Sequence, residues 1–253
     1  LEGIAVGLLM SIALFVINYS KVEVIKHELS GQTLHSNVER SEKLNSVVEQ
    51  RGNQIFILPL QGFIFFGTAH RLLERVTDRL ALDTEEKLTY LIFDFRQVTG
   101  LDSSTINSFN KLHIMAENKK FKVLFCDIKK FMARQLAVEG LLPDDSGLFI
   151  EFSDLDHGLE WCEEQIIDQE EATTVESIKA SESFKTRFVD IAIYFKTMDV
   201  KPGTLIIEQG KDPNGIYFIE SGRITVQLET EKGKDIRLKS MGDGTVVGEV
   251  SLY

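Results

Sequence analysis

Residues 88–105, LTYLIFDFRQVTGLDSST, determine the fold that we predict for the middle of the chain. The run 88–95 is short and mostly apolar, which is typical of a strand buried on both faces of a sheet. After a polar turn, Ile106, Phe109 and Leu112 recur at helical spacing. The stretch therefore predicts a buried strand that leads into an amphipathic helix.

The same alternation of strand and helix continues on both sides of this stretch. Further strands are predicted at 54–60, 121–126 and 148–152, and helical spacing follows each of them. Such alternation indicates a mostly parallel sheet covered by helices. Because Pro59 has no backbone N–H, we expect an edge or a bulge near the end of the first strand. Thr68 is the expected N-cap of the helix that follows.

The composition excludes several classes of protein. The chain has 253 residues, with 28 Lys and Arg against 39 Asp and Glu, so its formal net charge is −11, and 43% of its residues are hydrophobic. Such a chain buries a core, and its acidity argues against a nucleic-acid partner. Cys126 and Cys162 cannot form a disulfide framework, which favours a reducing compartment. Residues 139–182 hold 14 acidic residues and a single base, Lys179, and they mark a domain boundary near residue 170.

The N-terminal segment has the character of a membrane helix. Residues 3–20 carry no charge, and 18 residues at a rise of about 1.5 Å cover roughly 27 Å, close to the hydrocarbon thickness of a bilayer. Lys21 and Lys26 follow, so the positive-inside rule predicts that the chain after about residue 20 is cytoplasmic. A buried helix of a soluble core remains an alternative. Residues 21–52 are polar with scattered aliphatic side chains, which suits a tether.

The loop 98–105 is the first candidate site. It lies between the C-terminal end of a predicted strand and the N-terminus of a helix, where α/β sheets bind ligands and free N–H groups attract anions. Asp102, Ser103 and Ser104 are the polar side chains there. Two interpretations stay open: an anion or phosphorylation site, or a helix N-terminus that Ser103 or Ser104 simply caps.

The sequence Asp102-Ser103-Ser104 resembles the signature of STAS domains, which sulfate permeases and anti-sigma-factor antagonists share. In the antagonists the second serine of this motif accepts a phosphate, so the resemblance implies Ser104 as a phosphorylation site. Thr105 stands where the antagonists usually have glycine.

The resemblance extends to the SulP anion permeases. Residues 61–69, QGFIFFGTA, are similar to a segment of SulP STAS domains, and residues 19–22, YSKV, are similar to the exit of the last SulP membrane helix. Membrane helix, connector and STAS domain also follow one another in the order of that family.

The last part of the chain has a different pattern. From about residue 183 an amphipathic helix is predicted, followed by short strands with glycine-bearing turns, which suggests an all-β roll. This part contains residues 202–210, PGTLIIEQG, residues 216–222, IYFIESG, and residues 242–252, GDGTVVGEVSL. These stretches resemble the cyclic-nucleotide-binding fold, in which a Gly-Glu pair opens the phosphate-binding cassette and the Glu binds a ribose hydroxyl. Gly248 and Glu249 match that pair. The family's phosphate-binding arginine would lie after Tyr253, so we expect this chain to bind cyclic AMP or cyclic GMP weakly or not at all. A roll that binds no nucleotide remains an alternative.

The predicted fold class is an α/β STAS-type domain with a mostly parallel sheet and helices, after one transmembrane helix and followed by a partial all-β roll of cyclic-nucleotide-binding type. The boundaries are 1–20 for the membrane helix, 21–52 for the juxtamembrane connector, 53–168 for the STAS domain, 169–182 for an acidic linker and 183–253 for the truncated roll.

Three functions are compatible with this organisation. The first is the cytoplasmic regulatory region of a SulP-type secondary anion transporter of the sulfate or bicarbonate class, cut from a longer chain. The second is a single-span membrane signalling protein with a STAS phosphorylation switch, and the third is a soluble ligand sensor. We expect no enzyme activity, metal or cofactor, because the five histidines stand alone and no catalytic motif is present. The expected partners are the membrane, the transport domain of the same chain, a second copy in a homodimer, and a cyclic nucleotide.

Overall fold

The computed structural model describes residues 3–11, 23–82, 86–142, 144–173, 195–211, 215–229 and 235–248. It divides into two compact units. The first unit consists of Leu1–Leu34 and Arg51–Cys162, and the second unit consists of His35–Gln50 and Glu163–Tyr253.

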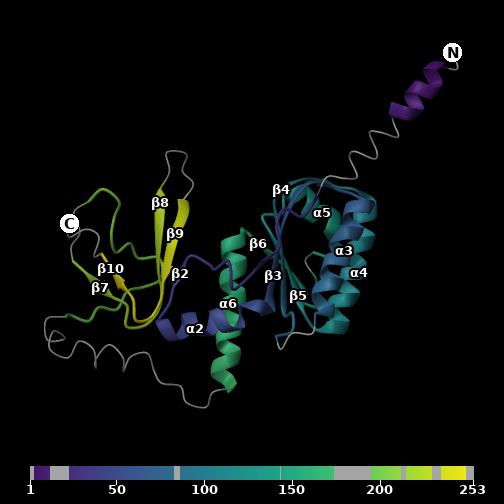
Figure 1. Cartoon of the computed structure of the whole chain (residues 1–253). Helices are drawn as coiled ribbons and strands as arrows, with labels where there is room; N and C mark the ends of the chain where they lie inside the picture. The colour runs from purple at the N-terminus through teal and green to yellow at the C-terminus, as the bar shows by residue number, and fades with distance from the viewer. Residues whose placement is uncertain are drawn as a thin grey trace. The chain divides into compact units, whose positions relative to one another are not determined.

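The first unit is built on a five-stranded sheet (Figure 1). Its strand order is β1-β3-β4-β5-β6, in which β3 to β6 are parallel and β1 runs antiparallel at the edge. The strands are β1 (Leu29–Ser30), β3 (Ile55–Ile64), β4 (Tyr90–Leu101), β5 (Lys122–Cys126) and β6 (Phe149–Phe152). The mostly parallel sheet predicted from the sequence is therefore confirmed.

Pro59 interrupts the pairing of β3, as the sequence predicts. The register between β3 and β4 shifts between Pro59 and Gln61. On the other edge the Pro59 carbonyl accepts a hydrogen bond from the Lys26 amide at 2.9 Å, and the Gln61 amide donates to the Val24 carbonyl at 2.8 Å. The segment before β3 thus pairs with this edge of β3 through the Pro59 carbonyl and the Gln61 amide, which do not involve the N–H that proline lacks.

Helices cover both faces of the sheet (Figure 1). Helices α3 (Phe66–Ala81), α4 (Ser103–Lys119) and α5 (Lys130–Val138) pack their apolar sides on one face. The core there is aromatic, with Phe93, Phe95, Phe109 and Phe125 in mutual ring contact at centroid distances of 5.5 to 6.4 Å. Alternate residues of each central strand thus face this layer, and the others face the opposite side.

The part of helix α6 (Leu155–Thr173) that belongs to the first unit, up to Cys162, lies on the opposite face of the sheet. Gly158 sits so close to β5 that a Cβ there would lie 2.6 Å from Cys126 Sγ. Trp161 contacts Tyr90 and Phe152, with ring centroids at 5.7 and 5.8 Å. A glycine is therefore needed at position 158 for the close approach of helix and strand.

Thr68 is not the N-cap of α3, so that prediction is wrong. The N-cap is Phe65, and Thr68 lies three residues into the helix. The Thr68 hydroxyl accepts from the Phe65 amide at 2.9 Å and lies 3.0 Å from the Phe65 carbonyl. Threonine satisfies the free N-cap amide from inside the helix, which the sequence alone does not distinguish from capping.

The second unit contains two small sheets. Strands β2 (Val38–Glu39), β9 (Asp235–Met241) and β8 (Ile224–Glu229) form one sheet in that order, and β10 (Val246–Val247) pairs with β7 (Tyr217–Phe218). Ile219, Met241 and Val247 form a small buried core. These strands agree with a partial β roll.

The predicted connector is more than a tether. It contains β1, β2 and helix α2 (Glu42–Arg51), and Val24 and Val48 within it are buried. Its residues 35–50 belong to the second unit, where β2 pairs in parallel with β9. Polar character suggested a tether because the pairing partner lies about 200 positions away in the sequence.

The N-terminal segment is described only in part. Residues 3–11 are helical, and residues 12–22 lie outside the described residues. The acidic linker predicted at 169–182 is wrong at its start, because residues 169–173 continue helix α6. The rest of that linker and the predicted amphipathic helix up to residue 194 lie outside the described residues. Among the helices in the described ranges, none combines the length and apolar character needed to cross a membrane.

Candidate functional site

The strand and the helix around Asp102 meet without a loop. Strand β4 runs to Leu101, where a loop from residue 98 was expected, and α4 begins at Ser103. Asp102 is the N-cap, and its Oδ1 accepts a hydrogen bond from the Thr105 amide at 2.8 Å. The alternative in which Ser103 or Ser104 caps the helix is therefore wrong.

Thr105 joins the start of α4 to the end of β3. Its side chain is fully buried, and its hydroxyl lies 2.9 Å from the Ile64 carbonyl and 2.8 Å from Asp102 Oδ1. The single hydroxyl proton can serve one acceptor at a time. The Asp102 amide also donates to the Ile64 carbonyl, at 3.0 Å. A glycine at position 105 would lack the hydroxyl, so Thr105 fixes this junction more firmly than a glycine could.

The Asp102 carboxylate is held in its charged form. Burial raises the pKa of Asp102, but hydrogen bonds from Ser104, Thr105 and the Phe66 amide outweigh burial and hold the pKa below its ordinary value. Ser104 Oγ donates to Asp102 Oδ1 at 2.6 Å, and Ser104 is half-buried whereas Ser103 is exposed. The structure thus brings Asp102 and Ser104 together, and leaves Ser103 outside this contact.

Two exposed aromatic residues lie on the segment that meets this junction. Phe66 is 68% exposed and Phe63 is 37% exposed. Gly100 lies against Phe63, because a Cβ at position 100 would come within 2.7 Å of the Phe63 ring. Lys129 donates to the Val98 carbonyl at 2.8 Å, so its ammonium group is engaged with the backbone of β4.

Gly248 lies at the end of β10 with a positive φ of 96°. A Cβ there would lie 2.7 Å from the Gly215 carbonyl oxygen, so the position requires glycine for conformation and for space. Glu249, the residue expected to bind a ribose hydroxyl, lies outside the described residues. The space beside Gly248 is thus occupied by the protein's own backbone.

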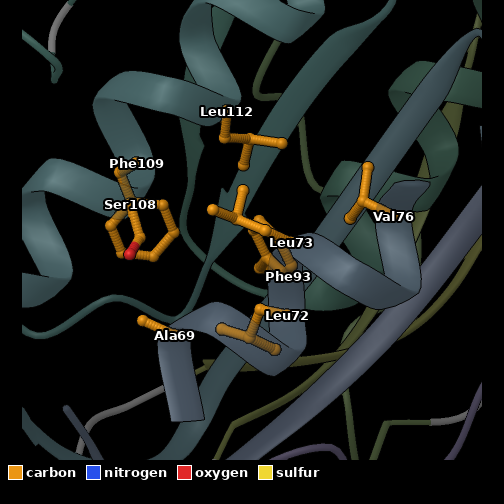
Figure 2. Close-up of a pocket in the computed structure, with 8 residues that line it drawn as sticks. All are labelled: Ala69, Leu72, Leu73, Val76, Phe93, Ser108, Phe109 and Leu112. Carbon is orange, nitrogen blue, oxygen red and sulfur yellow. The ribbon is translucent and has the colours of Figure 1, made fainter. Parts of the chain in front are cut away.

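A small apolar cavity lies between α3 and α4 (Figure 2). Its volume is about 10 Å³, and Ser108 is the only polar residue among those that line it. The figure shows the side chains of Leu72, Leu73 and Phe93 pointing toward one another there. A cavity of this size holds one water molecule at most, so it is a packing defect and not a ligand site.

The described ranges contain no group of three or more His, Cys, Asp or Glu side chains placed to hold a metal ion.

The second unit contains a buried charge cluster that sequence reasoning missed. The side chain of Glu163, on α6, is fully buried, and its two oxygens accept from the Ser36 amide at 2.9 Å, from the Ser36 hydroxyl and from Arg40 Nη1 at 2.7 Å. The Arg40 side chain is 7% exposed. His35 Nδ1 lies 3.6 Å from Glu163 Oε1. The partners are more than 120 positions apart in the sequence, and no local pattern distinguishes Glu163 from its neighbour Glu164.

Two parts of the chain match known domain families. Residues 46–149 match the STAS domain, and residues 197–253 match the cyclic nucleotide-binding domain.

Two curated proteins align with most of the chain. The vacuolar basic amino acid transporter VSB1 of Saccharomyces cerevisiae is 27% identical over 256 residues, which cover 98% of this chain and 24% of the yeast protein. Glutaminase 2 of Bradyrhizobium diazoefficiens is 26% identical over 214 residues, which cover 81% of this chain and 33% of that enzyme. The chain therefore spans a quarter to a third of the length of these relatives.

A solved structure is similar to part of the chain. The murine Solute Carrier 26 family member A9 anion transporter, in its inward-facing state, superposes with a TM-score of 0.45 and 17% identity, over 65% of this chain and 26% of that one.

Proposed function

Because the chain combines a STAS domain with a cyclic nucleotide-binding domain, we propose that it is a regulatory region of a membrane transporter. The observation that carries this proposal is the alignment with the yeast transporter, which extends over 98% of this chain but only 24% of that protein. The other three quarters of such a protein are long enough to form a transport pathway, which one apolar helix cannot form. In this proposal the chain acts on that pathway.

The second relative supports a regulatory role over a chemical one. A stretch similar to this chain also occurs in a protein that is named as a glutaminase. The alignment covers 81% of this chain and one third of that enzyme. A region that accompanies both a transporter and an enzyme cannot itself carry both activities. We therefore propose that the chain performs no catalytic step.

The transported solute is decided outside this region. A sulfate or bicarbonate substrate follows only from the resemblance to SulP permeases, whereas the yeast relative is named for basic amino acids and the murine structure for anions. The same kind of regulatory region thus fits more than one solute.

The apolar segment supports membrane attachment. Residues 3–20 carry no charge, and in the helical part Ile4 and Leu9 are 76% and 67% exposed. Apolar side chains exposed on all sides of a helix are stable in lipid and costly in water. In our proposal this segment spans the membrane, and the residues after about 20 are cytoplasmic.

Membrane extraction tests the proposal against its main competitor. The competitor is a regulatory region of a soluble enzyme, which the glutaminase relative favours. The chain is expressed with a C-terminal reporter, and membranes are washed at alkaline pH. We expect retention in the membrane pellet, and loss of retention in the variant Leu9→Lys/Leu14→Lys, since each lysine near the centre of a span costs about 3 kcal/mol.

The matched control is Leu9→Met/Leu14→Met, which keeps the segment apolar and should remain in the pellet. Release of the wild-type chain by alkali would contradict the membrane helix and favour the soluble competitor.

The ligand of the roll belongs to the same proposal. We propose that a cyclic nucleotide is its ligand, on the basis of the match over residues 197–253 and of Gly248 and Glu249. Calorimetric titration with cyclic AMP and cyclic GMP tests it, in a chain extended beyond Tyr253 to include the family's arginine. Glu249→Ala is the control and should weaken any binding. Absence of heat with both nucleotides in the extended chain would reduce this part to a structural roll.

A further inference from the structure

Residues 35–50, which we name the coupling segment, lie between strands β1 and β3 of the first unit in the sequence but belong to the second unit. The chain passes between the two units after Leu34, after Gln50 and after Cys162. Two of these three passages are therefore the ends of the coupling segment, and the third lies inside α6. The segment is therefore connected covalently to the first unit at both of its ends.

The first anchor of the segment is the buried Glu163 cluster. Ser36 and Arg40 together supply three hydrogen bonds to the Glu163 carboxylate, whose side chain is fully buried. Removal of one partner of a buried ion pair is strongly destabilising because it leaves an uncompensated charge. This anchor therefore fixes the start of the segment to α6.

The second anchor is the pairing of β2 with β9. It has only two residue pairs, Val38 with Ser240 and Glu39 with Met241. The Ser240 amide donates to the Asn37 carbonyl at 2.8 Å, and the Gly242 amide donates to the Glu39 carbonyl at 3.3 Å. Such a short ladder is much easier to break than a buried charge cluster.

The weaker anchor lies on the side of the proposed nucleotide cassette. Gly242 begins the turn that leads into β10, and Gly248 follows β10 directly. The Gly244 amide donates to the Ile219 carbonyl at 2.8 Å, and the Ile219 amide donates to the Thr245 carbonyl at 2.9 Å. The backbone groups that hold β2 therefore lie at the start of this turn and directly before it.

We propose that the coupling segment is a conformational coupling device. When the packing of β9 and of the turn after it changes, the segment changes its position, and this alters its contacts with α6 and the chain connections at residues 34 and 50. The Glu163 cluster is the fixed end, and the two-residue ladder is the end that opens and closes. The device depends on contacts inside the second unit and does not require that a nucleotide binds, so it stands or falls separately from the proposed function.

Amide hydrogen exchange of the whole chain tests this device. The variant Glu163→Gln keeps one acceptor oxygen and replaces the other with an NH2 donor, which then faces either the Ser36 amide or the Ser36 hydroxyl and Arg40. We expect exchange of the Ser240 and Gly242 amides to rise on the order of a hundred-fold, although neither residue contacts Glu163 in the contacts described above. Because Glu163→Gln could unfold the unit, Arg40→Lys is a milder variant with an expected rise of about ten-fold.

The matched control is Glu28→Gln, which removes a half-exposed ion pair with Arg75 in the first unit and should leave both amides unchanged. Exchange of the Leu124 amide in β5 reports whether the first unit is intact. Faster exchange at Ser36 alone, with Ser240 and Gly242 unchanged in both cluster variants, would overturn the proposal.

The reverse perturbation provides an independent test, because coupling between two sites is reciprocal. Met241→Ala removes a side chain from the small core beside β2 and should accelerate exchange of the Ser36 amide, which donates to Glu163. An unchanged Ser36 amide in a Met241→Ala chain whose β9 amides exchange faster would overturn the coupling.

Discussion

A negative charge on Ser104 should destabilise the start of α4, although helix N-termini generally favour anions. Ser104 Oγ lies 2.6 Å from Asp102 Oδ1, and the low pKa of Asp102 keeps that carboxylate charged at neutral pH. A phosphate or an introduced carboxylate at position 104 therefore stands beside an existing negative charge. We take Ser104→Asp as the perturbation.

The magnitude follows from three contributions. Two unit charges about 4 Å apart repel by about 1 kcal/mol in water and about 4 kcal/mol at the effective dielectric constant of a protein surface. Loss of the hydrogen bond from Ser104 to Asp102 costs about 1 kcal/mol, and the helix dipole returns about 0.3–1 kcal/mol. We expect Ser104→Asp to lower the free energy of unfolding by roughly 1–4 kcal/mol, and Ser104→Ala by about 1 kcal/mol.

Urea unfolding followed by tryptophan fluorescence measures this difference in the free energy of unfolding, and the signal comes from the first unit, which contains Ser104. Trp161 is the only tryptophan of the chain, and it packs on Tyr90 and Phe152 of the first unit. Ser104→Asn is the matched control, since it has the shape of aspartate without the charge. The difference between the two variants should shrink in high salt, which screens partly exposed charges.

A double-mutant cycle tests whether the charge of Asp102 causes the effect of Ser104→Asp. If Asp102 is the cause, then Asp102→Asn should remove most of the difference between Ser104→Asp and Ser104→Asn, as a double-mutant cycle would show. Equal stability of Ser104→Asp and Ser104→Asn in low salt would refute the reasoning and leave Ser104 with an ordinary structural role.

Three further predictions concern packing, a buried hydroxyl and acid stability. Gly158→Ala should lower the free energy of unfolding by about 1–3 kcal/mol in urea titrations, because its Cβ would lie 2.6 Å from Cys126 Sγ; a stabilised variant would contradict the packing of α6. Ser240→Ala should be neutral or stabilising by up to about 1 kcal/mol in thermal unfolding, since its buried hydroxyl has no hydrogen-bond partner in the described residues; a loss above that value would reveal a partner. Burial raises the pKa of Asp144, but hydrogen bonds from Ser146, Phe149 and Leu148 outweigh it and lower the pKa, so this carboxylate contributes stability that is present above about pH 4 and is lost as the pH falls. Asp144→Asn should therefore be less stable than wild type at pH 7, with the gap closing in acid; a constant gap from pH 7 to pH 2 would refute this.

The sheet of the first unit was predictable because its strands are buried on both faces. Apolar runs of five to eight residues leave little choice of structure once helical patterns separate them. The end of β4 was missed because the apolar run stops at Phe95. The strand continues to Leu101, and alternation is seen only over residues 97–100, where Gln97 and Thr99 are exposed while Val98 is buried. A search for alternation after the apolar run would have found it.

The cap of α4 was harder to assign from the sequence. Aspartate and serine are nearly equal as N-cap residues, so three consecutive candidates leave the first helical residue open. The choice is made by tertiary contacts, since the Ile64 carbonyl accepts from the Asp102 amide and lies beside the Thr105 hydroxyl. The Glu163 cluster is a stronger case, because its partners meet only after the second unit has folded.

The free-energy change expected at the Asp102 junction is smaller than the change needed to convert one conformation fully into another. A shift of 1–4 kcal/mol changes the ratio of two conformations by about 5-fold to 1,000-fold, whereas a change from 1:99 to 99:1 needs about 5.5 kcal/mol. On these values a charge at Ser104 by itself would not convert one conformation fully into another, and a complete change of state would require a second contribution.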